Sequence, residues 1–259
     1  MNIVNRLRTA GCALGAMALC LCLISGANAA ETISPDQKKA FEGVIRDYLL
    51  KNPEIIAEAF EVLQEKQKIA EADASRAVLQ SQSAVLFNDP ESPVAGDRNG
   101  DVTIVEFFDY RCGVCKRVHP IVDTLMKGDG KLRRVYKDWP ILGPESVFAS
   151  RAALASRAQG KYLPFHNAMM EARGKLDKNA VFKIAEKAGI DLPRLVRDMD
   201  SAGITNILRR NYQLAEALKL NGTPSFVIGG HILKGGHILK GGRDLETMRQ
   251  IVADTRAGK

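Results

Sequence analysis

Two cysteines at the end of an apolar strand constrain this chain more than any other feature. The run Val102–Tyr110 is mostly apolar, which predicts a buried strand, and it leads into Cys112-Gly-Val-Cys115. Residues 116–127 then follow a helical pattern, so the first cysteine is expected at a helix N-terminus, where backbone N–H groups and the helix dipole stabilise a thiolate. Cys112 is therefore predicted to be the exposed nucleophile, and Cys115, one turn further in, to resolve the mixed disulfide.

A metal site is the alternative interpretation of the same two sulfurs. A zinc site normally has four ligands, and the sequence offers no second cysteine pair. His119 follows Cys115 by four residues, so a Cu(I) site built on the two thiolates stays open as a hypothesis. The spacing favours redox chemistry, and we expect neither a resident metal nor an organic cofactor.

The N-terminal segment predicts export. Arg6 and Arg8 precede an apolar run from about residue 13 to 24, and Ala27-Asn28-Ala29 gives a small-x-small cleavage pattern before Ala30. The run is shorter than the roughly 20 residues that a bilayer span needs, so residues 1–29 are interpreted as a signal peptide. Three of the five cysteines lie in this segment, and the residues around them do not fit lipid attachment: Cys12, Cys20 and Cys22.

Cleavage would leave only the dithiol in an oxidising compartment. A disulfide closing so small a loop adds little stability, which favours a chemical role for the pair. The net charge of +7 over 259 residues is mild and does not indicate a nucleic-acid-binding protein.

Two amphipathic helices are predicted ahead of the sheet, within residues 30–83. The first covers residues 34–51, with Ser34 and Gln37 as a capping box, and the second runs from Pro53 to about Leu79. Its apolar stripe is thin and repeats every seven residues over a short distance. The segment either packs on its own domain or joins copies of the chain, and we favour oligomerisation.

The remaining order is loop (88–101), strand, helix, strand (132–139), a helical block (144–218), strand (225–228) and helix (244–255). This order predicts an α/β protein with a small mixed sheet and an inserted helical domain.

Three segments then carry a resemblance: VEFFDYRCGVCKRVHP, YKDWPILGPES and NGTPSFVIGG. They resemble the DsbA family of exported thioredoxin-fold thiol–disulfide oxidoreductases, and in particular its oligomeric members with an N-terminal helical extension, such as ScsC and Com1-like proteins. The resemblance implies a thioredoxin fold over residues 84–259, with its helical insertion at about 144–218, preceded by an oligomerisation segment.

The resemblance also implies roles for residues around the dithiol. Thr223 and Pro224 are expected to form a cis peptide beside it and to guide an extended client, together with Gly113 and Val114 of the motif. Glu106, in mid-strand, is expected to lie under the dithiol and to assist proton transfer, with Lys137 as its partner. A plain structural ion pair or an outward-facing side chain is the alternative for Glu106.

Departures from the oxidant members indicate a different activity. Val114 stands where C-P-H-C oxidants have a histidine that favours the thiolate, so we expect a less acidic Cys112 and a less oxidising dithiol. A threonine before the cis proline also resembles the disulfide isomerases. The favoured function is a periplasmic isomerase or reductase that acts on client proteins with thiols or disulfides, is reset by a membrane redox partner and forms a homo-oligomer, with a trimer favoured by the resemblance. A DsbA-like oxidant, a periplasmic copper(I) carrier using the same cysteines, and an inert surface protein are the alternatives.

One repeat is unexplained by this function. The hexapeptide HILKGG at residues 231–236 recurs at once at residues 237–242. Because a six-residue shift keeps the same side chains inward, either copy could form the last strand. We interpret the repeat as a tandem duplication that lengthens a loop. A role of His231 and His237 as metal ligands is the weaker interpretation. His166, outside the repeat, is interpreted as an ordinary structural histidine.

Overall fold

The computed structural model describes residues 34–230 and 236–258. The predicted signal peptide, residues 1–29, and the first copy of the repeat from His231 onward lie outside the described residues. The chain divides into two compact units, residues 1–62, of which 34–62 are described, and residues 63–259.

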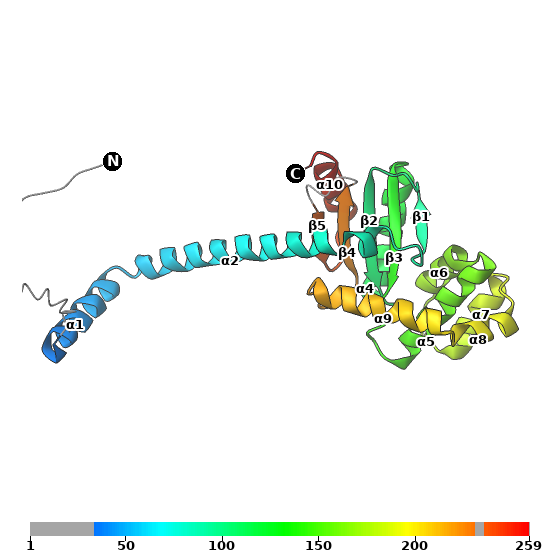
Figure 1. Ribbon diagram of the computed structural model, residues 1–259, viewed down its shortest axis with the longest axis horizontal. Helices are drawn as coiled ribbons and strands as arrows, with labels where there is room; N and C mark the ends of the chain where they lie inside the picture. Colours follow the sequence, from blue (N-terminus) through cyan, green and yellow to red (C-terminus); the bar gives the residue numbers. More distant parts are fainter. Residues whose placement is uncertain (1–33, 231–235, 259) are drawn as a thin grey trace, which may run out of the picture. The chain divides into compact units, whose positions relative to one another are not determined.

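Two helices form the N-terminal extension (Figure 1). Helix α1 (Pro35–Lys51) starts with the predicted capping box, in which Ser34 and Gln37 exchange hydrogen bonds of 2.9 and 3.2 Å. Helix α2 (Glu54–Ser81) follows. Ten large apolar side chains of the extension are at least half exposed: Phe41, Val44, Ile45, Tyr48, Leu50, Ile56, Phe60, Val62, Leu63 and Ile69. These side chains do not pack against one another within the two helices.

The second unit, residues 63–259, called the catalytic unit below for the dithiol that it carries, is built on a five-stranded mixed sheet in the order β1-β3-β2-β4-β5. The strands are β1 (Val94–Gly96), β2 (Val102–Phe108), β3 (Leu132–Asp138), β4 (Ser225–Gly230) and β5 (Gly236–Lys240). Strands β2 and β3 are parallel, and the other three neighbouring pairs are antiparallel. Strand β1 falls inside the predicted loop 88–101, because a three-residue strand shows no alternation that a sequence could reveal.

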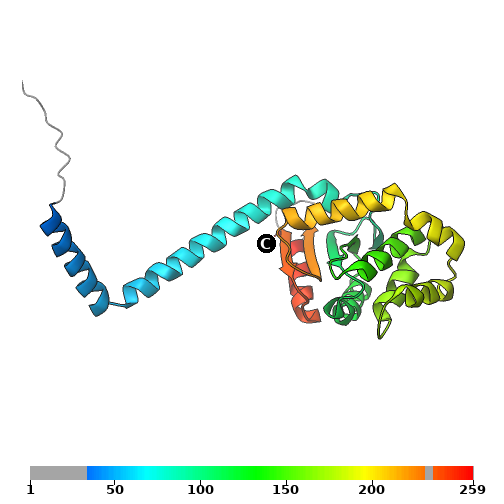
Figure 2. The same ribbon diagram turned by 90° about the horizontal axis from the view of Figure 1, so that it is seen from below.

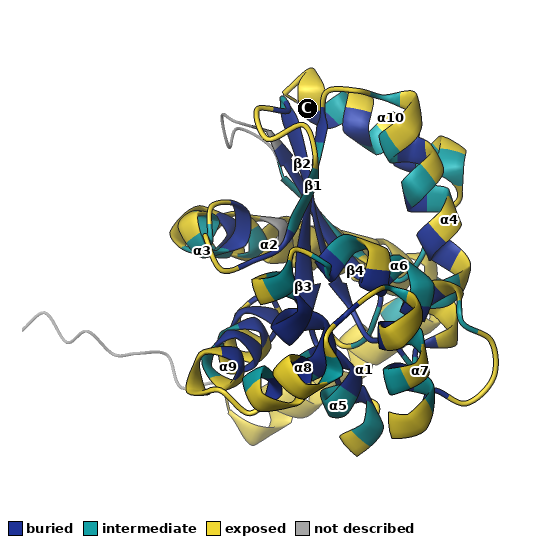
Figure 3. Cartoon of the chain, turned by 90° about the vertical axis from the view of Figure 1, so that its right-hand side faces the viewer, coloured by how far each residue is buried: buried dark blue, intermediate teal, exposed yellow. Residues whose placement is uncertain are grey.

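Side chains alternate along β2 and contribute to two cores, one on each face of the sheet. Figure 3 shows helices on both sides of these strands. Val102 and Ile104 face α4 (Gly113–Gly128) and α10 (Leu245–Arg256). Val105 and Phe107 face the other side, against α3 (Ser83–Phe87), α9 (Ala202–Ala217) and the end of α2, whose Leu79 is buried. Figure 2 shows α9, in gold, and α10, in red, on opposite sides of the strands.

The predicted helical block is confirmed as an insertion between β3 and β4. It comprises α5 (Pro144–Ala155), the 3₁₀ turn η1 (Ser156–Gln159), α6 (Tyr162–Glu171), α7 (Lys178–Lys187), α8 (Leu192–Met199) and α9. Four alanines of α5 are buried: Ala149, Ala152, Ala153 and Ala155. Their small side chains let the neighbouring helices approach closely. The fold is thus the thioredoxin fold with a helical insertion and an N-terminal helical extension.

The second copy of the hexapeptide supplies the last strand. His237, Ile238, Leu239 and Lys240 pair with β4, and Ile238 lies opposite Val227.

Candidate active site

Cys112 is the N-cap residue of α4, as the sequence predicts. Its Sγ accepts a hydrogen bond from the backbone N–H of Cys115 at 3.4 Å and lies 3.2 Å from the carbonyl oxygen of Thr223. Cys112 is 8% exposed and Cys115 is fully buried. Only the first sulfur is therefore accessible to a client.

The two thiols of this motif differ in acidity. Hydrogen bonds from the side chains of Cys115 and Thr223 and from the first backbone amides of α4 lower the pKa of Cys112 to about 5, against the opposing effect of burial. Burial, in contrast, raises the pKa of Cys115 far above its ordinary value, with a further rise from the thiol of Cys112. At neutral pH the reduced protein holds a thiolate at Cys112 and a thiol at Cys115.

The peptide bond between Thr223 and Pro224 is cis, which agrees with the expectation from the resemblance. It precedes β4, and the carbonyl oxygen of Pro224 accepts a hydrogen bond from the N–H of Gly241 at 2.9 Å. Gly113 and Val114 lie on the exposed rim of the motif, with Val114 37% exposed.

Glu106 is buried and lies on the α4 side of the sheet, because it alternates with Ile104 along β2. Its Oε2 accepts two hydrogen bonds from Arg134, from Nε at 2.9 Å and from Nη2 at 2.5 Å. Arg134 also donates a hydrogen bond to Asp123 on α4, at 2.7 Å. The other carboxylate oxygen of Glu106, Oε1, has no hydrogen-bond partner among the described residues. The charge of Glu106 also contributes to the raised pKa of Cys115.

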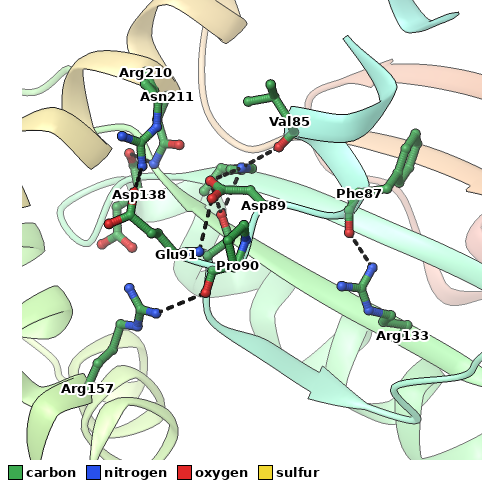
Figure 4. A network of polar contacts seen from close by, with 12 residues as sticks. Val85, Phe87, Asp89, Pro90, Glu91, Arg133, Asp138, Arg157, Arg210 and Asn211 are labelled. Atoms are coloured by element: carbon green, nitrogen blue, oxygen red, sulfur yellow. Dashed lines mark hydrogen bonds and ion pairs between the residues drawn. The ribbon is translucent and has the colours of Figure 1, made fainter.

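Lys137 was the wrong partner for Glu106. Lys137 follows Arg134 by three residues in β3. Because side chains alternate along a strand, it faces the opposite side of the sheet. There its Nζ donates to Asp89, to Ser92 and to the carbonyl oxygen of Val85, at 3.1, 2.8 and 2.8 Å. Figure 4 shows this network, in which Arg133, Arg157 and Arg210 bind the same segment through Phe87, Pro90 and Glu91. Lys137 thus fastens residues 85–92 to the sheet.

Asp109 is a site residue that sequence reasoning missed. It follows β2 directly, is fully buried and accepts four hydrogen bonds: from the N–H groups of Arg111, Ile141 and Leu142 and from the hydroxyl of Ser146. These bonds hold the turn before Cys112 and the loop after β3 together. The signal was an acid at the end of an apolar strand, three residues before the motif.

His166 and His119 are packed inside the protein. His166 is buried, and its Nδ1 lies 3.0 Å from the Tyr110 hydroxyl. His119 is buried beside it, with ring centroids 5.4 Å apart, and its Nε2 lies 3.4 Å from Asp123. Within residues 34–230 and 236–258, no cluster of three or more His, Cys, Asp or Glu residues is arranged to hold a metal ion. Over the same residues, no helix has the length and apolarity for a membrane crossing.

Comparison with known proteins places this geometry in a family. The family described as DSBA-like thioredoxin domain matches residues 103–253, and the one described as copper resistance protein ScsC N-terminal domain matches residues 37–70.

Similar solved structures and curated relatives indicate the same family. A thioredoxin-like oxidoreductase from Silicibacter pomeroyi is 42% identical, with a TM-score of 0.64 over 67% of this chain and 97% of that one. ScsC from Proteus mirabilis, in a transitional conformation, is 28% identical, with a TM-score of 0.64 over 88% of this chain and 99% of that one. The thiol:disulfide interchange protein DsbA of Bordetella parapertussis is 26% identical over 60% of this chain and 76% of its own length.

Some curated relatives are much longer proteins. The chain spans about a quarter of the length of the Na⁺/H⁺ antiporters it matches, 26% for the one from Salinispora tropica. The DSBA-like match, in contrast, covers more than half of this chain, including the strand, the dithiol, the insertion and the cis proline. The chain belongs to the DsbA family of thioredoxin-fold thiol–disulfide oxidoreductases, close to ScsC.

Proposed function

We propose that the protein exchanges disulfides with client proteins through Cys112 and Cys115. The observation that carries this proposal is the contrast between an accessible thiol with a pKa of about 5 and a buried one, one helical turn apart. The Cys112 thiolate attacks a client disulfide, forms a mixed disulfide and releases the second client sulfur as a thiolate. Cys115, once deprotonated, attacks Cys112 and releases the first client sulfur. The oxidised protein runs the same steps in reverse.

Glu106 is proposed as the group that takes the proton from Cys115. It lies on the α4 side of the sheet, and its Oε1 has no hydrogen-bond partner among the described residues. The Cys115 thiol must lose its proton before it attacks, since its pKa lies far above neutrality. A buried carboxylate on this side of the sheet supplies the acceptor.

Client binding is proposed at the cis peptide and the rim of the motif. Thr223 precedes a strand, so its backbone is placed to pair with an extended client beside Cys112. Val114 and Gly113 would contact the residues next to the client cysteine.

Isomerase or reductase activity is the finer proposal. A Cys112 pKa of about 5 lies between the roughly 3.5 of the oxidant DsbA and the roughly 7 of thioredoxin, which supports an intermediate redox potential. The exposed apolar stripe of α1 and α2 supports an oligomer, with residues 30–83 as the segment that joins copies of the chain into a homo-oligomer, most simply a trimer, and 84–259 as the catalytic domain. Export to the periplasm and resetting by a membrane redox partner complete the proposal.

A copper(I) carrier is the second candidate. The specific observation in its favour is the match of residues 37–70 to a domain described by copper resistance, together with two adjacent sulfurs that suit a soft cation. Copper(I) affinity of the reduced protein, compared with its turnover in disulfide exchange, separates the two functions.

Reactivation of scrambled ribonuclease tests the isomerase proposal. The mature protein would be compared with a form lacking residues 31–62, which leaves the second unit and Leu79 in place, and with Cys112→Ser as the inactive control. We expect reactivation by the full-length form and a loss of most of it on truncation. No reactivation by the full-length protein would refute the isomerase and leave a reductase, an oxidant or a copper carrier.

A further inference from the structure

Two arginines near the dithiol, Arg117 and Arg243, form no ion pair with a carboxylate among the described residues. Arg117 is exposed on the first turns of α4, and a long helical side chain leans toward the helix N-terminus. A Cβ atom placed on Gly113 would lie 3.6 Å from its Nη1. The guanidinium therefore lies over the motif, in space that the missing side chain of Gly113 leaves open.

Arg243 directly follows a segment that packs on α4 beside the motif. The residue before it, Gly242, packs so closely on α4 that an added Cβ would meet Val118 at 2.3 Å and Val114 at 3.6 Å. Gly241, one residue earlier, donates to the carbonyl oxygen of Pro224. Arg243 itself is exposed, and its Nη1 donates only to the adjacent carbonyl of Gly242 among the described residues.

Four other charged residues near the motif are already engaged. Arg111 pairs with Glu145 at 3.1 Å, and the Nζ of Lys116 points to carbonyl oxygens at the end of α6. Asp109 is saturated by its four hydrogen bonds, and Asp244 caps α10 through Thr247. Neither Arg117 nor Arg243 takes part in an ion pair within the described residues. The pKa of Cys112 is lowered chiefly by hydrogen bonds, so these two cations remain available to a client.

We propose that Arg117 and Arg243 select clients whose reactive cysteine is flanked by aspartate or glutamate. The inference rests on the proposed function, since it names the class of client for the same dithiol. A client cysteine that reaches Cys112 brings its neighbouring residues to the rim of the motif, where the two guanidinium groups supply positive charge. Acidic neighbours gain Coulomb attraction and basic ones meet repulsion, and salt weakens both.

A single exchange step tests this selection. The mature chain carrying Cys115→Ser would react with acetylated pentapeptides Gly-X-Cys-X-Gly, in which X is Glu, Gln or Lys and the cysteine is a mixed disulfide with thionitrobenzoate. The Cys112 thiolate attacks the peptide sulfur, the new disulfide forms, and the thionitrobenzoate anion leaves and is measured by its colour. The leaving group is the same for all three peptides, so the rates report the effect of X.

We expect the Glu peptide to react about tenfold faster than the Lys peptide at low ionic strength, with the ratio approaching one in high salt. Arg117→Gln with Arg243→Gln should reduce the ratio at least about threefold, whereas Arg249→Gln, an exposed arginine of α10 outside the site, should leave it unchanged. Equal rates for the three peptides, or a ratio that survives the double substitution, would overturn the inference. Failure of even the Gln peptide to react would instead refute disulfide exchange by Cys112.

Discussion

Substitution of Arg134 by methionine should destabilise the catalytic unit strongly. Arg134 is 1% exposed, holds the fully buried Glu106 through two hydrogen bonds and reaches Asp123 through a third. Methionine keeps much of the side-chain volume over the ring of Tyr136, which Arg134 covers at 4.7 Å. What it removes is the partner of a buried carboxylate whose Oε1 finds no hydrogen bond in the part of the chain that the structure describes.

The expected loss in the free energy of unfolding is about 3–5 kcal/mol, the usual cost of leaving one member of a buried ion pair without the other. For a unit of this size it corresponds to a fall in melting temperature of roughly 6–20 °C. Urea unfolding of the mature protein at neutral pH, followed by circular dichroism, measures it.

Two further variants make the result specific. Arg256→Met is a matched control, because Arg256 also binds two carboxylates, Asp101 and Asp129, but is 37% exposed; it should cost no more than about 1 kcal/mol. Replacing both partners, Glu106→Leu with Arg134→Met, should recover most of the lost stability. Equal losses for Arg134→Met and Arg256→Met, or a double variant no more stable than Arg134→Met, would refute the argument that Glu106 depends on Arg134.

Three other predictions concern separate parts of the molecule. Burial raises the pKa of Asp138 to about 7, so its ionisation opposes folding increasingly as the pH rises from about 4 to 7; Asp138→Asn should gain stability over the wild type across that window, and unfolding curves that keep a constant difference would contradict it. Deletion of residues 231–236 joins Gly229-Gly230 to the second hexapeptide copy and leaves a two-residue Gly-Gly hairpin in the same register; disulfide exchange should persist, and loss of folding by circular dichroism would show that the added length is needed. Ile45→Lys, on the exposed stripe, should reduce the mass measured by light scattering with little change in thermal stability of the catalytic unit, and an unchanged mass would contradict the oligomer.

The path from strand to dithiol to helix was predictable because each step has a local cause. The apolar run before Cys112 can only be buried as a strand, and the helical pattern after Cys115 fixes which sulfur caps the helix. The capping box at Ser34 is likewise local and is present as predicted. The helical insertion followed from the absence of strand patterns over a long stretch.

The partner of Glu106 depended on information that a single sequence does not carry. Glu106 lies opposite Tyr136 in the parallel pair β2–β3, so residues two positions away from Tyr136 share its face. That parity selects Arg134 and excludes Lys137, but it can be applied only once the register of the two strands is known. Strand β1 was not predicted for a related reason: its three residues form a strand only because they pair with β3.

The ionisation of Cys112 tests the central claim most directly. The mature reduced protein would be alkylated with iodoacetamide across a range of pH, with the modified cysteine identified by mass spectrometry. The account predicts modification at Cys112 alone, with a rate that reaches half its plateau at a pH of about 5. A midpoint near the ordinary thiol value of 9.0, or equal modification of Cys115, would contradict an accessible thiolate at the start of α4 as the reacting group.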